Sequence, residues 1–137
     1  MRIFFDSSAF VKRYVQEEGT DEVLALCDQA TELCLSGIAL VEIIAAFCRL
    51  QRENRVSPSQ YRQLKTLLME DITDAAISDL TPEVIRHSII SLEGNILRGM
   101  DALHIGSALS LKADLFVTAD ARQHRAAIQA GLRVTQI

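Results

Sequence analysis

The chain has 137 residues, enough for one ordinary domain and too few for a second hydrophobic core. Hydrophobic residues make up 49% and charged residues 23%, which excludes a disordered protein, and no apolar run suits a signal peptide or a membrane span. The formal net charge of -4 argues against nucleic-acid binding by bulk electrostatics, although acidic metal ligands in a nuclease would lower the charge in the same way. We expect a single cytoplasmic domain over residues 1–137.

Short apolar runs alternate with helical patterns along the chain, which is typical of β–α units around a parallel sheet. The apolar runs predict strands at 3–5, 33–35, 115–117 and 132–137, and an extended segment or strand at 72–80. Apolar spacing and capping residues predict helices from Ser8 through Tyr14, from a Thr20 cap to Cys27, and at 38–54, 58–71, 82–94, 101–112 and 121–130. Together these elements indicate one doubly wound α/β domain. Its three cysteines, Cys27, Cys34 and Cys48, are expected to be reduced and buried.

Four carboxylates stand in apolar surroundings that a solvated helix face does not explain. Asp6 directly follows the first predicted strand, and Asp120 follows a later strand and a short turn. Glu42 is the only charged residue in an otherwise apolar stretch, and Asp101 opens a helix with little polar surface. An ionised carboxylate in such a setting is unfavourable by several kcal/mol unless it is paired or binds a metal.

The positions of these carboxylates predict a shared cation site. Ligands of open α/β sheets bind beyond the carboxyl ends of the strands, so we expect the four side chains to face one crevice. An all-oxygen ligand set favours Mg²⁺ or Mn²⁺ over Zn²⁺, and the usual chemistry at such sites is phosphoryl transfer or phosphodiester hydrolysis. Each residue also has a structural alternative, because Asp6 and Asp120 could cap helices, Asp101 could face a helix dipole and Glu42 could pair with a distant arginine.

The segments around the four carboxylates resemble the PIN-domain ribonucleases, in particular the VapC toxins of toxin–antitoxin pairs. The resemblance is carried, in order and over essentially the full length, by IFFDSSAFVK at 3–12, LVE at 40–42, LRGMDALH at 97–104 and FVTAD at 116–120. It implies a three-layer α/β/α domain with a central parallel sheet and an acidic pocket that binds Mg²⁺ or Mn²⁺. It also implies cleavage of single-stranded or looped RNA by metal-activated water, a homodimer, and inhibition by a small VapB-type antitoxin whose tail covers or enters the pocket.

Transferred position by position, the resemblance assigns roles to individual residues. The acidic metal ligands and catalytic positions fall on Asp6, Glu42, Asp101 and Asp120. Hydroxyls that would orient these carboxylates or hold water fall on Ser7, Ser8 and Thr118, with Ser7 standing where threonine is common.

Two basic side chains near Asp101 have more than one interpretation. Arg98 could contact a substrate phosphate or neutralise the carboxylates, and a surface or structural ion pair explains it at least as well. His104 lies one helical turn past Asp101, and we interpret it as a packed, hydrogen-bonded histidine rather than as a catalytic base.

Three other functions stand as alternatives. The chain could be a non-catalytic PIN-like binding module, or a nuclease acting on single-stranded DNA, since phosphate and metal chemistry are shared. A phosphohydrolase for small phosphoesters is a third alternative, but its commonest α/β form needs a second acid two residues after the nucleophilic aspartate, where this chain has Ser8.

Overall fold

Strands and helices alternate along the whole chain, and the computed structural model describes residues 1–137. The strands are β1 (Arg2–Phe5), β2 (Glu32–Ser36), β3 (Ala76–Ser78), β4 (Leu115–Thr118) and β5 (Val134–Gln136). The helices are α1 (Ser7–Phe10), the 3-10 turn η1 (Val11–Arg13), α2 (Thr20–Gln29), α3 (Gly37–Arg52), α4 (Pro58–Asp74), α5 (Pro82–Gly94), α6 (Gly99–Ser110) and α7 (Ala121–Gln129). This element order confirms the α/β class.

The five strands form one parallel sheet in the order β3-β2-β1-β4-β5. The chain therefore begins in the middle of the sheet, winds outward to one edge, and then returns to fill the other side. Ile3 of β1 is in register with Leu33 of β2 and with Leu115 of β4. In such doubly wound sheets the crevice for a ligand lies beyond the carboxyl ends of the two strands where the winding reverses, here β1 and β4.

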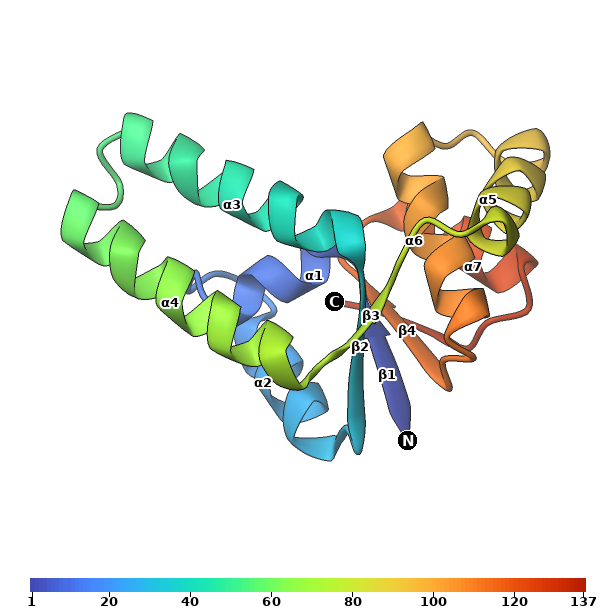
Figure 1. The fold of residues 1–137 in the computed structure, drawn as a ribbon, viewed down its shortest axis with the longest axis horizontal. Helices are drawn as coiled ribbons and strands as arrows, with labels where there is room; N and C mark the ends of the chain where they lie inside the picture. The colour runs from blue at the N-terminus through green and yellow to red at the C-terminus, as the bar shows by residue number, and fades with distance from the viewer.

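Successive side chains of β1 point to opposite layers of helices, because side chains alternate along a strand. Ile3 and Phe5 belong to the larger buried cluster, which packs against α1 to α4. Phe4 points the other way, stacks on Phe116 at 5.3 Å between ring centroids, and packs with Ile105 of α6. Figure 1 shows α1 to α4 on one side of the sheet and α5 to α7 on the other. The predicted three-layer α/β/α architecture is confirmed.

Helix starts follow the predicted capping chemistry at two of three places. Ser57 forms a reciprocal capping box with Gln60, and the Thr81 hydroxyl accepts a hydrogen bond from the third residue of α5. The start of α2 differs, because its N-cap is Gly19 with a φ of 93°. The Thr20 hydroxyl instead accepts a hydrogen bond from the backbone N–H of Glu17 and so braces the turn before the helix.

The element boundaries depart from the predictions in two segments. The helix expected from Ser8 to Tyr14 is a single α-turn followed by a 3-10 turn. The extended segment expected at 72–80 is reduced to β3, because Leu68 and Ile72 continue the apolar stripe of α4, which extends to Asp74.

The three cysteines are free thiols, as predicted, but their burial differs from the prediction. Cys34 lies in the sheet and is fully buried, whereas Cys27 and Cys48 lie on helices and are only partly buried. The apolar neighbours that suggested burial are sequence neighbours, and on a helix these point in different directions.

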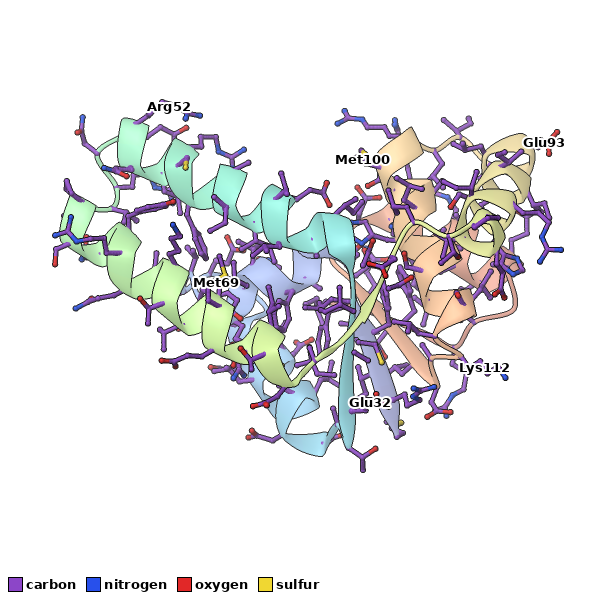
Figure 2. The ribbon with its side chains drawn as sticks, in the orientation of Figure 1. Glu32, Arg52, Met69, Glu93, Met100 and Lys112 are labelled. Carbon is purple, nitrogen blue, oxygen red and sulfur yellow. The ribbon has the colours of Figure 1, made fainter.

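Helices α3 and α4 form a long antiparallel pair on one side of the sheet (Figure 1). Figure 2 places Arg52 near the far end of this pair and Met100 at the start of α6, across from the beginning of α3. None of the helices is long and apolar enough to cross a membrane. The fold thus places the first turns of α3 and α6 on opposite sides of the carboxyl edge of the sheet.

Candidate active site

Asp6 lies directly after β1 and is only 3% exposed. Its Oδ1 accepts hydrogen bonds from the Ser8 hydroxyl at 2.6 Å and from the Ala9 backbone N–H at 3.0 Å, and its Oδ2 accepts one from the Thr118 hydroxyl. Burial raises the pKa of this carboxyl, and the opposing effects of His104 and of these hydrogen bonds do not cancel the shift. No ion pair includes Asp6. A buried carboxylate of this kind is stabilised when a cation binds to it.

Thr118, the last residue of β4, connects Asp6 to Asp120. Its hydroxyl donates to Asp6 and accepts a hydrogen bond from the Asp120 backbone N–H at 3.0 Å. Oδ1 of Asp120 caps α7 by accepting from the Gln123 backbone N–H at 2.9 Å. Asp6 caps α1 in the same way, so the capping interpretation is confirmed for both residues. Capping uses one carboxylate oxygen, and it leaves Oδ2 of Asp120 without a hydrogen bond.

Glu42 lies in the second turn of α3 and is held by two side chains from other elements. Its Oε1 accepts a hydrogen bond from the Ser7 hydroxyl at 2.7 Å and lies 2.6 Å from Nε2 of His104. Burial alone would raise the pKa of the Glu42 carboxyl, but the hydrogen bonds from His104 and Ser7 outweigh it and hold the pKa below its ordinary value. The packed, hydrogen-bonded His104 that the sequence predicts is confirmed, and its partner is a candidate metal ligand. Glu42 has no arginine partner.

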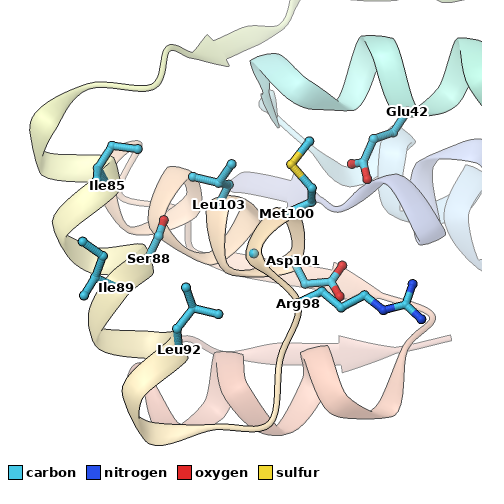
Figure 3. A pocket seen from close by; sticks show the side chains of 10 residues that line it. Glu42, Ile85, Ser88, Ile89, Leu92, Arg98, Met100, Asp101 and Leu103 are labelled. Carbon is cyan, nitrogen blue, oxygen red and sulfur yellow. The ribbon is translucent and has the colours of Figure 1, made fainter.

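Asp101 lies in the first turn of α6, half-buried and without a hydrogen bond to its carboxyl group. Burial raises the pKa of this carboxyl, and the charge of Asp120 raises it further, followed by the charges of Asp6 and Glu42. His104 opposes this effect. The three predicted partners of Asp101 are therefore close enough to act on it electrostatically, and Figure 3 shows Glu42 and Asp101 on facing sides of one pocket.

Glu42 and Asp101 line one pocket, and Thr118 links Asp6 to Asp120 beside it, but the four carboxylates do not form a closed metal cage. The structure contains no group of three or more His, Cys, Asp or Glu side chains arranged to hold a metal ion together. Mg²⁺ keeps several water ligands and is commonly bound through one or two carboxylates, so a closed protein cage is not required. Asp6 and Asp101 are hard oxygen donors, and neither takes part in an ion pair. This donor set fits Mg²⁺ or Mn²⁺.

A cavity of about 580 Å³ extends from the carboxylates between α5 and α6. Glu42, Asp101 and Arg98 lie at one end of it, and mostly apolar side chains of α5 and α6 line the rest (Figure 3). Arg98 precedes α6, is exposed, and takes part in no ion pair, so the ion-pair interpretation of this residue is wrong. Its guanidinium group remains available to an anion at the edge of the crevice.

Gln123 is a buried contributor to the site that the sequence analysis missed. It is fully buried on α7, and its side-chain N–H donates to the backbone carbonyl of Asp101 at 2.9 Å. The only signal in the sequence is its position three residues after the cap Asp120, which is the spacing of a capping box. Its side chain instead reaches across to α6 and fixes the turn that carries Asp101.

The sequence of this chain matches a known protein family and a named protein of that family. The PIN domain family matches residues 3–129. Ribonuclease VapC45 of Mycobacterium tuberculosis (strain CDC 1551 / Oshkosh) is 31% identical over 134 residues, which cover 96% of this chain and 93% of that protein.

Solved structures share the fold at low sequence identity. FitAcB from Neisseria gonorrhoeae has a TM-score of 0.75 at 14% identity, with coverage of 98% of this chain and 96% of that chain. A toxin-antitoxin complex from Klebsiella pneumoniae has a TM-score of 0.70 at 13% identity, with coverage of 98% and 99%. Together with the match to the family, these similarities confirm the resemblance seen in the four sequence segments. The chain belongs to the PIN-domain family, as a protein of the VapC type.

Proposed function

We propose that this protein is an endoribonuclease that depends on Mg²⁺ or Mn²⁺ and acts as the toxin of a toxin–antitoxin pair. The observation that carries the proposal is the placement of the carboxylates where the sheet winding reverses: Asp6 and Asp120 follow β1 and β4 and are linked through Thr118, and Glu42 and Asp101 face each other across one pocket. RNA as the substrate class is supported by the name of the similar Ribonuclease VapC45.

The reaction is hydrolysis of a phosphodiester, in which the oxygen of water bonds to phosphorus and the bond from phosphorus to the leaving oxygen breaks. A bound divalent cation supplies Lewis acidity and offsets the negative charge of the phosphate. The carboxylates hold that cation, while Ser7, Ser8 and Thr118 hold the carboxylates through the hydrogen bonds described above. Arg98 binds a phosphate of the strand at the edge of the crevice.

Two protein partners are proposed, a VapB-type antitoxin and a second copy of this chain. The Klebsiella pneumoniae structure with this fold is a toxin-antitoxin complex, which supports the antitoxin. Exposed isoleucines on α5 support the second copy. A non-catalytic binding module is disfavoured, because a protein without catalysis would gain stability by losing its clustered carboxylates.

The test is cleavage of RNA by the purified protein with Mg²⁺ or Mn²⁺, compared with the same reaction in EDTA and with single-stranded DNA of matched sequence. Asp101→Asn is expected to lower cleavage at least about 100-fold without unfolding the chain, because it removes a metal ligand. Asp28→Asn, which changes an exposed carboxylate on α2, is the matched control and keeps full activity.

Each alternative function has its own outcome in this experiment. Cleavage that persists in EDTA, or in Asp101→Asn, contradicts the metal-dependent mechanism. Cleavage of DNA but not RNA selects the DNA nuclease, and absence of Mn²⁺ binding by calorimetry selects the non-catalytic module.

A further inference from the structure

Two side chains from two other elements meet at one oxygen of Glu42. Ser7 at the start of α1 donates its hydroxyl proton to Oε1 at 2.7 Å, and Nε2 of His104 on α6 lies 2.6 Å from the same atom. The Ser7 oxygen and His104 Nε2 are themselves 3.3 Å apart. The second oxygen of Glu42, Oε2, takes part in no hydrogen bond.

His104 is held rigidly in its position by packing. Its side chain is 2% exposed, and its ring meets the edge of Phe4 at 6.2 Å between centroids with an interplanar angle of 73°. Nδ1 is buried and has no hydrogen-bond partner, so the only polar contacts of the ring are made through Nε2. A contact of 2.6 Å with a carboxylate oxygen is attractive only if Nε2 carries a proton, which assigns the proton to that nitrogen.

These contacts restrict Glu42 to one orientation. A glutamate on a partly exposed helix turn has three rotatable side-chain bonds, and fixing them is entropically unfavourable. Two donors on Oε1 offset that loss, and they leave Oε2 as the atom that can face the crevice. We propose that His104 is a positioning residue, which pins Oε1 of Glu42 so that Oε2 is presented to the divalent cation; this inference rests on the proposed function for the existence of that cation.

If His104 had only a packing role, it would fill the buried site without orienting the Glu42 carboxylate. Two substitutions separate packing from orientation. The amide nitrogen of His104→Gln reaches about the position of Nε2 and can donate to Glu42. His104→Leu keeps an apolar side chain in the buried site but has no donor. If His104→Leu does not fold, His104→Asn replaces it, because the shorter asparagine amide does not reach Oε1.

The measurement is Mn²⁺ binding by calorimetry on folded protein without RNA. We expect His104→Leu to weaken Mn²⁺ affinity by about 10-fold or more, as is typical when a residue that orients a metal ligand is removed, and His104→Gln to stay within about threefold of wild type. Ser7→Ala, which removes the other donor, is expected to fall between these two. His87→Leu changes a histidine on α5 outside the site and leaves the affinity unchanged. Nitrogen-15 NMR of the imidazole ring is expected to show the proton on Nε2.

Several results would overturn the proposal. Wild-type affinity in His104→Leu, or an equal loss in the leucine and glutamine variants, leaves His104 with a packing role only. A neutral ring whose proton is on Nδ1 has the same consequence, because Nε2 then has no proton to donate to Glu42. The proposed function fails separately if the wild type binds Mn²⁺ but does not cleave RNA, since the effect of His104 on Mn²⁺ binding then still stands. A wild type that binds no Mn²⁺ overturns both.

Discussion

Asp6 has two purposes, one observed and one proposed, and burial opposes the charge that both of them favour. As the cap of α1 it accepts hydrogen bonds, which favours the ionised form, and the proposed role as a metal ligand would also require an ionised carboxylate. Its burial works against ionisation and raises its pKa. In the absence of a cation the folded state therefore contains an unfavourable charge, as is common at sites where function limits stability.

Asp6→Asn should separate these two purposes. The variant keeps a side-chain oxygen for the Ser8 and Ala9 donors but has no charge to bury, so we expect RNA cleavage to be lost while the free energy of unfolding rises by about 1 kcal/mol in EDTA. Urea unfolding with cleavage assays on the same preparation measures both effects. Asp28→Asn should change neither quantity. A fall in stability for Asp6→Asn would show that the charge itself holds α1 in place.

For single residues, the sequence reveals a functional side chain when its type differs from that of its neighbours. It does not reveal side chains whose partners lie on another helix or strand. Asp6, Glu42 and Asp120 stand out because a charge follows an apolar run, and Asp101 because it opens a helix with little polar surface. Gln123 does not, because glutamine on a helix is ordinary and its contact with Asp101 depends on how α7 lies against α6. The pairing of His104 with Glu42 is hidden for the same reason, since 62 residues separate them.

The packing of α5 against α6 depends on the absence of a side chain at one position. A Cβ atom at Gly106 would lie 2.5 Å from the Val84 carbonyl oxygen and closer still to the Ser88 hydroxyl, which itself donates to that carbonyl at 2.7 Å. The two helices therefore touch through backbone and a small hydroxyl. Because α6 carries both Asp101 and His104, the close contact between α5 and α6 also fixes the position of these two side chains.

Gly106→Ala is expected to destabilise the protein by about 2 kcal/mol, because the helices must move apart to admit a methyl group. Gly99→Ala is the matched control on the same helix, since nothing lies within 4 Å of a Cβ there. Its free energy of unfolding should stay within about 0.5 kcal/mol of wild type. Urea denaturation of both variants compares them directly, and equal stabilities would show that α5 and α6 can separate without loss.

A polar network fastens η1 to the end of α4. The carboxyl of Asp71 accepts hydrogen bonds from the Arg13 guanidinium at 2.8 and 3.2 Å and from the Tyr14 hydroxyl. Burial raises the pKa of the Tyr14 hydroxyl, and its hydrogen bond to Asp71 raises it further. The folded protein therefore retains this proton at pH values where the unfolded chain releases it.

Tyr14→Phe removes one hydrogen bond to a charged group and should lower the free energy of unfolding by about 1.5 kcal/mol at pH 7. For a group whose folded pKa is raised, the contribution is complete below the unfolded pKa, 10.0 here, and is lost as pH rises through the folded value. The advantage of wild type over Tyr14→Phe should therefore be constant up to about pH 9 and shrink above pH 10. Urea titrations at pH 7, 9 and 10.5 measure it, and a difference that stays constant at pH 10.5 contradicts the assignment.

The order of elements follows from the sequence because parallel strands and their helices have distinct periodicities. The alternation along β1 even assigns Phe4 and Phe5 to opposite layers. The predicted element boundaries are wrong where local sequence patterns conflict. At residues 72–74 the apolar stripe of α4 continues beyond residue 71, where the sequence predicted the end of the helix. Short segments such as η1 depend on tertiary contacts, here those with Asp71, which no local pattern reveals.

At the scale of the whole molecule, the site lies where the two helical layers separate. Asp6 and Asp120 come from the sheet edge, Glu42 from the layer of α1 to α4, and Asp101 from the layer of α5 to α7. Neither layer alone contains the complete set of carboxylates. The net charge of -4 gives no overall attraction for a phosphate chain, so the proposed function requires the cation and local groups such as Arg98 to supply it.

An apolar stripe borders this site and has no covering element in the monomer. Ile85, Ile89 and Leu92 of α5, together with Ile96 in the following loop and Met100 of α6, are all exposed, Ile96 by 84%. The spacing of Ile85, Ile89 and Leu92 places them on one face of α5, and Figure 3 shows them beside the pocket together with Met100. Single exposed isoleucines are ordinary, but a continuous stripe marks a surface that another protein covers.

We expect a second copy of the chain to cover this stripe, so that light scattering on the purified protein gives the mass of a dimer. Ile89→Glu should weaken the dimer at least about 100-fold, because it would bury a charge among aliphatic side chains without a partner. Leu67→Glu, at a similarly exposed position on α4, is the matched control and should remain dimeric. Thermal unfolding of Ile89→Glu at high dilution distinguishes dissociation from misfolding, since the position is already 50% exposed in the monomer. A monomeric wild type would contradict the dimer, and dissociation by Leu67→Glu but not by Ile89→Glu would place the contact on α4.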